Sequence, residues 1–256
     1  MSRAELVVHQ TGELLADAVA ARLLTVLVDA QAERGRASLV LTGGRTGGAV
    51  LAALRTSLAR DAVDWSAVDF YWGDERFLPA GDPERNETLA REALLDHLPI
   101  DPARVHPMAA SDGPLGDDPD AAAAAYAEVL AGAVGRREGE SVPAFDVCLL
   151  GVGEEGHTAS IFPDSPAVHE RRLGVVAVRD CPKPPPTRIS LTLPAIRASA
   201  QVWLITTGAG KAEAVSAALR DADEVAVPAA GARGRQRTLW IVDSAAAALP
   251  DGGPPR

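Results

Sequence analysis

The chain has 256 residues, of which 47% are hydrophobic and 23% charged, and its formal net charge is −10. This composition is typical of a globular protein with a sizeable core, and the acidic balance argues against a nucleic-acid partner, which would require a basic face. The two cysteines, Cys148 and Cys181, indicate no disulfide framework, and neither a signal peptide nor a run of about 18 apolar residues is visible. We therefore expect a soluble, cytoplasmic protein without a membrane partner.

Apolar runs and helical periodicity alternate along nearly the whole chain. Residues 6–8 predict a strand. Thr11 is expected to cap the helix that follows and Gly35 to end it. The apolar positions of this helix are Leu14, Leu15, Val19, Leu23 and Leu27. Further strands are expected at residues 38–42, 68–72, 145–150, 173–178, 188–193, 201–206 and 238–242. Further helices are expected at 49–58, at 87–97 with Asn86 as cap, at 120–134, in a short piece ending near 163, and from an opening at 208–211 to about 219. The tail from 249 is expected to fray.

This alternation predicts an α/β fold in which helices cover both faces of a mostly parallel sheet, as one domain over residues 1–256. Ligands of such sheets bind at the carboxyl ends of the strands. Four glycine-rich or charged loops directly follow predicted strands, at residues 43–48, 73–76, 151–157 and 208–211. We therefore expect these loops to meet at one edge of the sheet.

Two of these loops have the composition of an anion site. In Gly43, Gly44, Arg45 and Thr46 the glycines would let backbone N–H groups approach a phosphate, and the helix that follows would add positive potential. An ordinary tight turn is the alternative. In the second loop, Asp74 and Arg76 could orient hydroxyls and an anion, or could simply be solvated.

The loop at residues 151–156 matches G-x-G-x-x-G. A dinucleotide site is disfavoured, because Pro163 and Pro166 interrupt the helix that would hold the pyrophosphate. His157 directly follows the loop, and an imidazole is suited to taking a proton from water near neutral pH. A structural histidine that bonds its own loop is the alternative.

Two cations are further candidates for phosphate binding. The sequence supports neither a covalent mechanism nor a metal site. Arg188 follows the stiff run Lys183 to Thr187, and Lys211 lies at a predicted helix start, although either could be an ordinary surface cation. No G-x-S-x-G elbow is present, Cys148 lies in an apolar run, and the five histidines lack metal-ligand spacing.

Three stretches, in this order, resemble the 6-phosphogluconolactonase family over roughly residues 5 to 245. They are Trp-Gly-Asp-Glu-Arg-Phe at 72–77, Gly-Val-Gly-Glu-Glu-Gly-His-Thr-Ala-Ser-Ile-Phe-Pro at 151–163, and Lys-Pro-Pro-Pro-Thr-Arg-Ile-Ser at 183–190. The resemblance implies the three-layer α/β/α fold of the group that also contains glucosamine-6-phosphate deaminases, ribose-5-phosphate isomerases and CoA transferases. Two loops depart from the family pattern: in the first, Arg45 and Gly47 replace a serine and a proline, and in the second, Glu155 replaces an aspartate.

The resemblance also implies an activity, the hydrolysis of 6-phosphogluconolactone in the oxidative pentose phosphate pathway, with no metal or organic cofactor. His157 would deprotonate the attacking water and Glu155 would hold the imidazole, while Asp74 would contact sugar hydroxyls or order the site. The 6-phosphate would be held by Arg76, Arg188, Lys211 and the turn Gly43, Gly44, Arg45 and Thr46. The oxyanion would meet backbone N–H groups of residues 43–44 or 153–157. The expected assembly is a monomer or a small homo-oligomer.

Two other functions are compatible with parts of this pattern. The first is a glucosamine-6-phosphate deaminase or isomerase, but in those enzymes the histidine loop continues with Ile-Ala-Phe-Asn-Glu-Pro, whereas residues 158–163 read Thr-Ala-Ser-Ile-Phe-Pro. The second is a non-catalytic sugar-phosphate sensor, for which no helix-turn-helix fits before Leu39. The lactonase reading is therefore preferred.

Overall fold

The computed structural model describes residues 3–134 and 141–248, and the predicted frayed tail lies outside these ranges. The strands are β1 Ala4–His9, β2 Ala37–Leu41, β3 Val68–Trp72, β4 Asp74–Arg76, β5 Val147–Gly151, β6 Val175–Val178, β7 Arg188–Leu191, β8 Gln201–Thr206 and β9 Arg237–Asp243. The α-helices are α1 Gly12–Arg34, α2 Gly44–Thr56, α3 Asn86–Ala93, α4 Pro119–Val134, α5 Leu193–Arg197, α6 Ala212–Leu219, α7 Pro228–Gly231 and α8 Ser244–Ala247. None of these helices combines the length and apolar character needed to cross a membrane.

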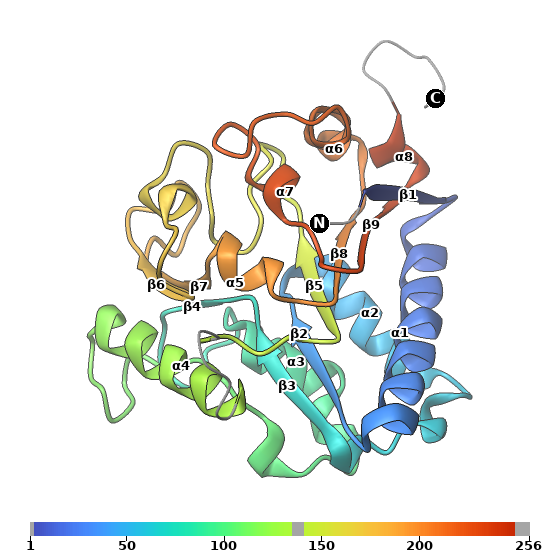
Figure 1. The fold of residues 1–256 in the computed structure, drawn as a ribbon, viewed down its shortest axis with the longest axis horizontal. Coiled ribbons are helices and arrows are strands. Elements are labelled where there is room, and N and C mark those ends of the chain that lie inside the picture. The colour runs from blue at the N-terminus through green and yellow to red at the C-terminus, as the bar shows by residue number, and fades with distance from the viewer. Residues whose placement is uncertain (1–2, 135–140, 249–256) are drawn as a thin grey trace.

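In the described residues, six strands form one parallel sheet in the order β1-β9-β8-β5-β2-β3, which confirms the predicted α/β fold. Helices α1 and α2 lie on one side of this sheet, and α4 lies on the other (Figure 1). Because both faces are covered, the central strands are buried almost throughout and read as continuous apolar runs. The six strands include all those predicted at residues 38–42, 68–72, 145–150, 201–206 and 238–242.

The limits of α1 and α2 follow from local chemistry. The Thr11 hydroxyl accepts the N–H of Leu14, and Gly35 ends α1 in the left-handed conformation at φ 71°, both as predicted. The predicted apolar positions of α1 are buried except Leu14, which is half-exposed. Helix α2 begins at Gly44 rather than at the predicted residue 49, so the glycine loop is its first turn. Gly47 permits this, because a Cβ there would lie 2.5 Å from the Thr42 carbonyl oxygen.

The structure corrects the prediction for residues 73–76 and for two of the strands. Residues 74–76 form strand β4 rather than a loop, and β4, β7 and β6 build a separate antiparallel sheet. The strands predicted at 173–178 and 188–193 therefore belong to this second sheet. Hydrogen bonds from the Gly73 N–H to the Leu41 carbonyl and from the Leu191 N–H to the Gly73 carbonyl join the two sheets.

Three helix predictions also require correction. Helix α3 ends at Ala93 and is followed by a 3-10 turn at Leu95–His97, and its capping position is Arg85 rather than Asn86. The short helix expected to end near residue 163 is absent, and that segment contains turns and a bridge between Thr158 and Ile161. The helix expected to open at 208–211 and to run to about 219 lies where predicted, but its opening is a 3-10 turn, Ala209–Lys211, before α6.

Candidate active site

The loops that follow β2, β3, β5 and β8 meet at the carboxyl edge of the parallel sheet, as the alternation predicted. The Gly151 N–H donates to the Thr42 hydroxyl (3.1 Å), which ties the loop after β5 to the end of β2. The hydroxyls of Thr46 and Thr207 lie 3.3 Å apart, which ties the first turn of α2 to the loop after β8. Residues more than a hundred positions apart therefore form one surface.

Asp74 is the centre of a buried polar network. Its Oδ2 accepts the hydroxyl of Ser160 (2.7 Å), and its backbone carbonyl accepts the side-chain amide of Asn86 (2.8 Å). The Ser160 N–H donates to the hydroxyl of Ser190 (3.1 Å), the residue paired with Asp74 in the β4–β7 register. All four side chains are buried. The network holds the segment after His157 against β4 and β7.

On the opposite face of β4, the Glu75 carboxylate anchors α3. It accepts the backbone N–H groups of Arg76 (2.7 Å), Asn86 (2.7 Å) and Glu87 (2.9 Å). Two of these N–H groups open α3, where a carboxylate offsets both the missing partners and the helix dipole. The Arg85 guanidinium lies 3.6 Å from Glu75 Oε2, and both side chains are almost fully buried. Asn86 is therefore placed by Glu75, a role that its sequence position did not indicate.

Arg188 is buried at 5% exposure, and its guanidinium is largely occupied by protein partners. It donates to the carbonyl oxygens of Lys183 (3.0 Å), Pro184 (3.1 Å) and Pro185 (3.1 Å), and its Nη1 lies 4.0 Å from Asp74 Oδ2. Arg188 therefore holds the loop that carries Lys183.

Arg76 is the register partner of Arg188 in the second sheet, so the two side chains share one face of that sheet. The Arg76 guanidinium donates to the Glu84 carbonyl (2.5 Å). The structure therefore brings the two predicted arginines together, and both have protein partners.

His157 lies at the end of the loop that follows β5. Its ring stacks on Phe162, with 4.4 Å between ring centroids, and the Arg188 guanidinium carbon lies 5.9 Å from the centroid of the same Phe162 ring. Glu155 Oε1 is 3.2 Å from His157 Nδ1, but the two atoms are not aligned as a hydrogen bond. The proximity of this carboxylate favours a proton on Nδ1, which leaves Nε2 as the basic atom.

Charges around His157 set its protonation. Burial lowers the pKa of His157, Glu155 opposes that shift, and Lys183 adds to it. Burial would raise the pKa of Glu155, but the hydrogen bond from Lys183 (2.8 Å) and the charges of His157 and Lys183 outweigh it and lower that pKa to about 2. The site thus combines a neutral imidazole with an ionised carboxylate.

A group of three cations, which we call the cation cluster, comprises Arg45, Lys183 and Lys211. Burial lowers the pKa of Lys211, Glu154 opposes the shift, and the positive charges of Lys183 and Arg45 add to it, so Lys183 and Arg45 each lie within electrostatic reach of Lys211. Helix α2 has no side-chain cap at Gly43, so the amides of its first turn, which include Gly44 and Thr46, are left for a ligand. This end of the site is suited to an anion.

Lys183 was not predicted as a site residue, although its position before the three prolines and Arg188 was a usable signal. Two further findings concern predicted features. Within the described residues, no group of three or more His, Cys, Asp or Glu could hold a metal ion. The amides of Gly153 and Gly156 donate to the carbonyls of His157 (2.8 Å) and Gly153 (3.1 Å), so they are used inside their own loop.

Comparison with known proteins gives one consistent result. Residues 10–240 match the model of the family described as glucosamine-6-phosphate isomerases/6-phosphogluconolactonase. A 6-phosphogluconolactonase of Streptomyces coelicolor is 63% identical over 95% of this chain and 93% of its own length. One of Mycobacterium tuberculosis is 54% identical over 93% of this chain and 95% of its own length. The solved structure of the 6-phosphogluconolactonase of Trypanosoma brucei matches with a TM-score of 0.81 and 29% identity, over 96% of this chain and 98% of that one.

Proposed function

This chain belongs to the glucosamine-6-phosphate isomerase/6-phosphogluconolactonase family, and we propose that it is a 6-phosphogluconolactonase, a hydrolase of the oxidative pentose phosphate pathway. The observation that carries the proposal is the placement of His157 and a partly paired carboxylate beside the cation cluster and the uncapped start of α2. A general base and an anion site lie together at the carboxyl edge of the parallel sheet. This pair suits a substrate that has a reactive carbonyl at one end and a phosphate at the other. The enzyme acts in the cytoplasm on this small molecule alone.

In the proposed reaction, His157 Nε2 takes a proton from a water molecule whose oxygen attacks the lactone carbonyl carbon. The tetrahedral intermediate collapses with cleavage of the bond from that carbon to the ring oxygen. The imidazolium returns its proton to the ring oxygen, which becomes a hydroxyl. The product acid ionises, so each turnover consumes one water molecule and releases one proton.

The residues divide into two proposed roles. The cation cluster and the first turn of α2, from Gly43 to Thr46, hold the phosphate. Arg188 and Arg76 act through the protein, because their guanidinium groups bond the loop at residues 183–185 and the Glu84 carbonyl. Asp74 orders the segment that carries Ser160. Glu155 orients the His157 imidazole and places a negative charge beside it.

The direct test is proton release from freshly prepared 6-phosphogluconolactone in weak buffer, corrected for spontaneous hydrolysis. We expect kcat/KM for the unphosphorylated lactone to be lower by at least about a hundredfold, because it forfeits two or more charge-assisted hydrogen bonds of about 1.5–3 kcal/mol each. Ammonia release from glucosamine 6-phosphate without acceleration of lactone opening would contradict the proposal in favour of a deaminase. Sugar-phosphate binding without either reaction would indicate a sensor.

The pH profile of kcat/KM tests the charges around His157. The neutral imidazole is the active form, so the rate rises with pH through the pKa of His157, and we expect this acid limb below pH 6.5, since burial lowers that pKa from 6.5. Lys183→Met removes a cation and should move the limb to higher pH. Glu155→Gln removes an anion and should move it to lower pH. Shifts of both variants in the same direction would disprove the assignment.

Gly153 tests the position of the imidazole. A Cβ at Gly153 would lie 1.9 Å from His157 Nδ1 and 2.8 Å from Glu155 Oε2, so Gly153→Ala must displace the ring. We expect kcat to fall by about a hundredfold, a typical cost of moving a catalytic group by 1 Å, while circular dichroism stays unchanged. Gly132→Ala is the matched control, because a Cβ there meets nothing within 4 Å. A Gly153→Ala enzyme with wild-type kcat would place the chemistry elsewhere.

A further inference from the structure

Asn86 connects two segments of the candidate active site that lie far apart in the sequence. It is the first residue of α3 and is only 3% exposed. Its side-chain Nδ2 donates to the Asp74 carbonyl oxygen (2.8 Å) and lies 3.4 Å from Asp74 Oδ1. Its backbone N–H donates to the Glu75 carboxylate (2.7 Å). Both the backbone and the side chain of Asn86 are therefore fixed on β4.

The same amide group also contacts the start of α2. A Cβ at Gly43 would lie 1.8 Å from Asn86 Oδ1, 2.4 Å from its Cγ and 2.9 Å from its Nδ2. The backbone of Gly43 is extended, with φ −82° and ψ −162°, a conformation that other residues also adopt. Glycine is therefore needed at position 43 because a side chain there would collide with the Asn86 amide.

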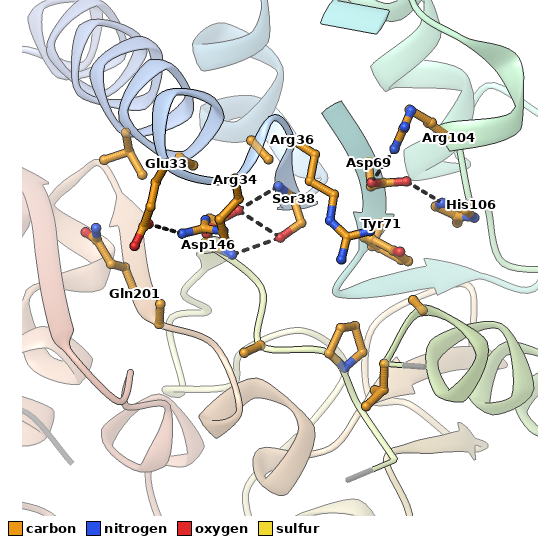
Figure 2. Close-up of a pocket in the computed structure, with 18 of the residues that line it drawn as sticks. Glu33, Arg34, Arg36, Ser38, Asp69, Tyr71, Arg104, His106, Asp146 and Gln201 are labelled. Carbon is orange, nitrogen blue, oxygen red and sulfur yellow. Dashed lines mark hydrogen bonds and ion pairs between the residues drawn. The ribbon is translucent and has the colours of Figure 1, made fainter. Parts of the chain in front are cut away.

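Asn86 Oδ1 is buried and has no hydrogen-bond partner among the described residues. A buried amide oxygen without a partner is unfavourable. By comparison, Asp69 and Asp146, which line the cavity at the opposite edge of the sheet, both accept hydrogen bonds from neighbouring side chains (Figure 2). The unpartnered oxygen lies directly against Gly43, so its position indicates a role at the start of α2.

Asp74 extends this connection toward the proposed general base. Its Oδ2 accepts the hydroxyl of Ser160 (2.7 Å), which lies three residues after His157. The side chains of Asn86, Asp74 and Ser160 are all buried. A chain of close contacts therefore runs from Gly43 to the segment that carries His157. Because protein interiors are densely packed, this chain fixes the separation of its two ends.

We propose that Asn86 is a positioning residue that fixes the distance between the first turn of α2 and His157. It thereby selects substrates in which the phosphate and the reacting carbonyl carbon are separated by the length of a six-carbon chain. The inference rests on the proposed function, which assigns the phosphate to one end and the carbonyl to the other. Asn86 is buried, so it acts through Gly43 and Asp74 rather than by touching the substrate. A ligand of matching length engages both ends at once, whereas a shorter one engages only one end.

The test is calorimetric titration of the full chain with 6-phosphogluconate, with 5-phosphoarabinonate, which is one carbon shorter, and with inorganic phosphate. We expect the parent to bind 6-phosphogluconate at least about tenfold more tightly than the shorter acid, the effect of one charge-assisted hydrogen bond. Asn86→Ala should reduce this preference to about twofold or less, because the two ends are no longer held at the matching distance. Inorganic phosphate, which occupies one end alone, should bind the variant as tightly as the parent. A merely structural role would weaken all three probes alike.

Gly43→Ala tests the same contact from the other side. The new Cβ must displace the Asn86 amide, so we expect the same loss of preference for the longer acid. Asn86→Ala removes the three atoms nearest to this Cβ, so the double variant should discriminate no worse than Asn86→Ala alone. Gly48→Ala is the matched control on the same helix, because the nearest neighbour of a Cβ there is Leu89 at an ordinary contact distance of 3.4 Å. It should keep the preference of the parent.

Circular dichroism checks that the variants fold, and Asn86→Ser, which also removes the amide, replaces Asn86→Ala if that variant does not fold. A parent that does not discriminate, equal losses for all three probes, or additive losses in the double variant would overturn the positioning role. Lactone turnover together with an unchanged preference in both single variants would overturn this inference alone. A preference that depends on Asn86, without any lactone turnover, would overturn the proposed function alone.

Discussion

His157→Ala is expected to lower kcat for 6-phosphogluconolactone by about 10²- to 10⁴-fold, the usual contribution of a positioned general base. The imidazole is the group suited to accept a proton from water here, because burial lowers the pKa of His157 and the neighbouring Glu155 carboxylate favours a proton on Nδ1. KM should change little, because the phosphate is assigned to the cation cluster. Initial rates of proton release over a range of lactone concentrations would separate the two constants.

His97→Ala is the control for this experiment. His97 is an exposed histidine outside the candidate site, and its ring Nε2 lies 3.0 Å from the Glu92 carbonyl oxygen. Its replacement should leave kcat within about twofold of the parent, as surface substitutions generally do. A His157→Ala enzyme as active as the His97→Ala enzyme would remove His157 from the reaction.

The parallel sheet could be predicted from the sequence because its strands are buried on both faces. Such strands are continuous apolar runs, as in residues 147–150 and 202–205, and they are separated by glycine-rich loops and helices. Once the strands are parallel, their carboxyl ends must lie together. The convergence of Gly43, Asp74, His157 and Lys211 at one edge was therefore predictable without knowledge of any contact, although Asp74 lies in strand β4 and not in a loop.

The antiparallel sheet was less accessible to this reasoning. Strand β4 has only three residues, all charged in sequence, and Asp74 and Glu75 are buried only because Ser160, Asn86 and backbone N–H groups satisfy their carboxylates. Those partners are contributed by distant segments. A charged triplet without them is a solvated loop, so local composition alone indicates the wrong state.

Side-chain roles in the candidate site depended on the same long-range contacts. Arg188 was predicted to face a phosphate; the structure adds that three carbonyl oxygens of its own loop accept hydrogen bonds from its Nε and Nη2. Lys183 lies in the loop that Arg188 holds, and it pairs with Glu155. The longer reach of a glutamate at position 155 allows one carboxylate to contact both Lys183 and His157. The sequence showed the substitution, but only the structure shows this bridging contact.

Arg85→Met is expected to lower the free energy of unfolding by about 3–5 kcal/mol at about pH 8, the cost of leaving a buried ion without its partner. Arg85 is fully buried and donates to the carbonyls of Leu78 (3.1 Å) and Met108 (2.8 Å) as well as approaching Glu75. Methionine fills a similar volume but supplies no charge. Urea unfolding at fixed pH measures the loss.

The pH dependence makes this prediction specific. Burial raises the pKa of Glu75 from 4.5 to about 7, although Arg85 opposes the shift. A raised folded-state pKa means that the stability contributed by this group is complete below about 4.5 and is lost as the pH rises through about 7. Without Arg85 the folded-state pKa rises further, so Glu75 takes up a proton and the destabilisation should shrink at about pH 6.

Arg91→Met is the control for this stability measurement. Arg91 is a half-exposed arginine on the same helix, paired with Glu87 at one turn's spacing (2.9 Å), and its loss should cost no more than about 0.5 kcal/mol at either pH. A loss for Arg85→Met that is equally large at about pH 6 and about pH 8 would assign it to packing or to the other hydrogen bonds of Arg85, with Leu78, Met108 and Glu87, rather than to the Glu75 charge. A pH-dependent loss would mean that the buried Glu75 carboxylate holds the Asp74 network and α3 in place, and that the Arg85 guanidinium neutralises its charge.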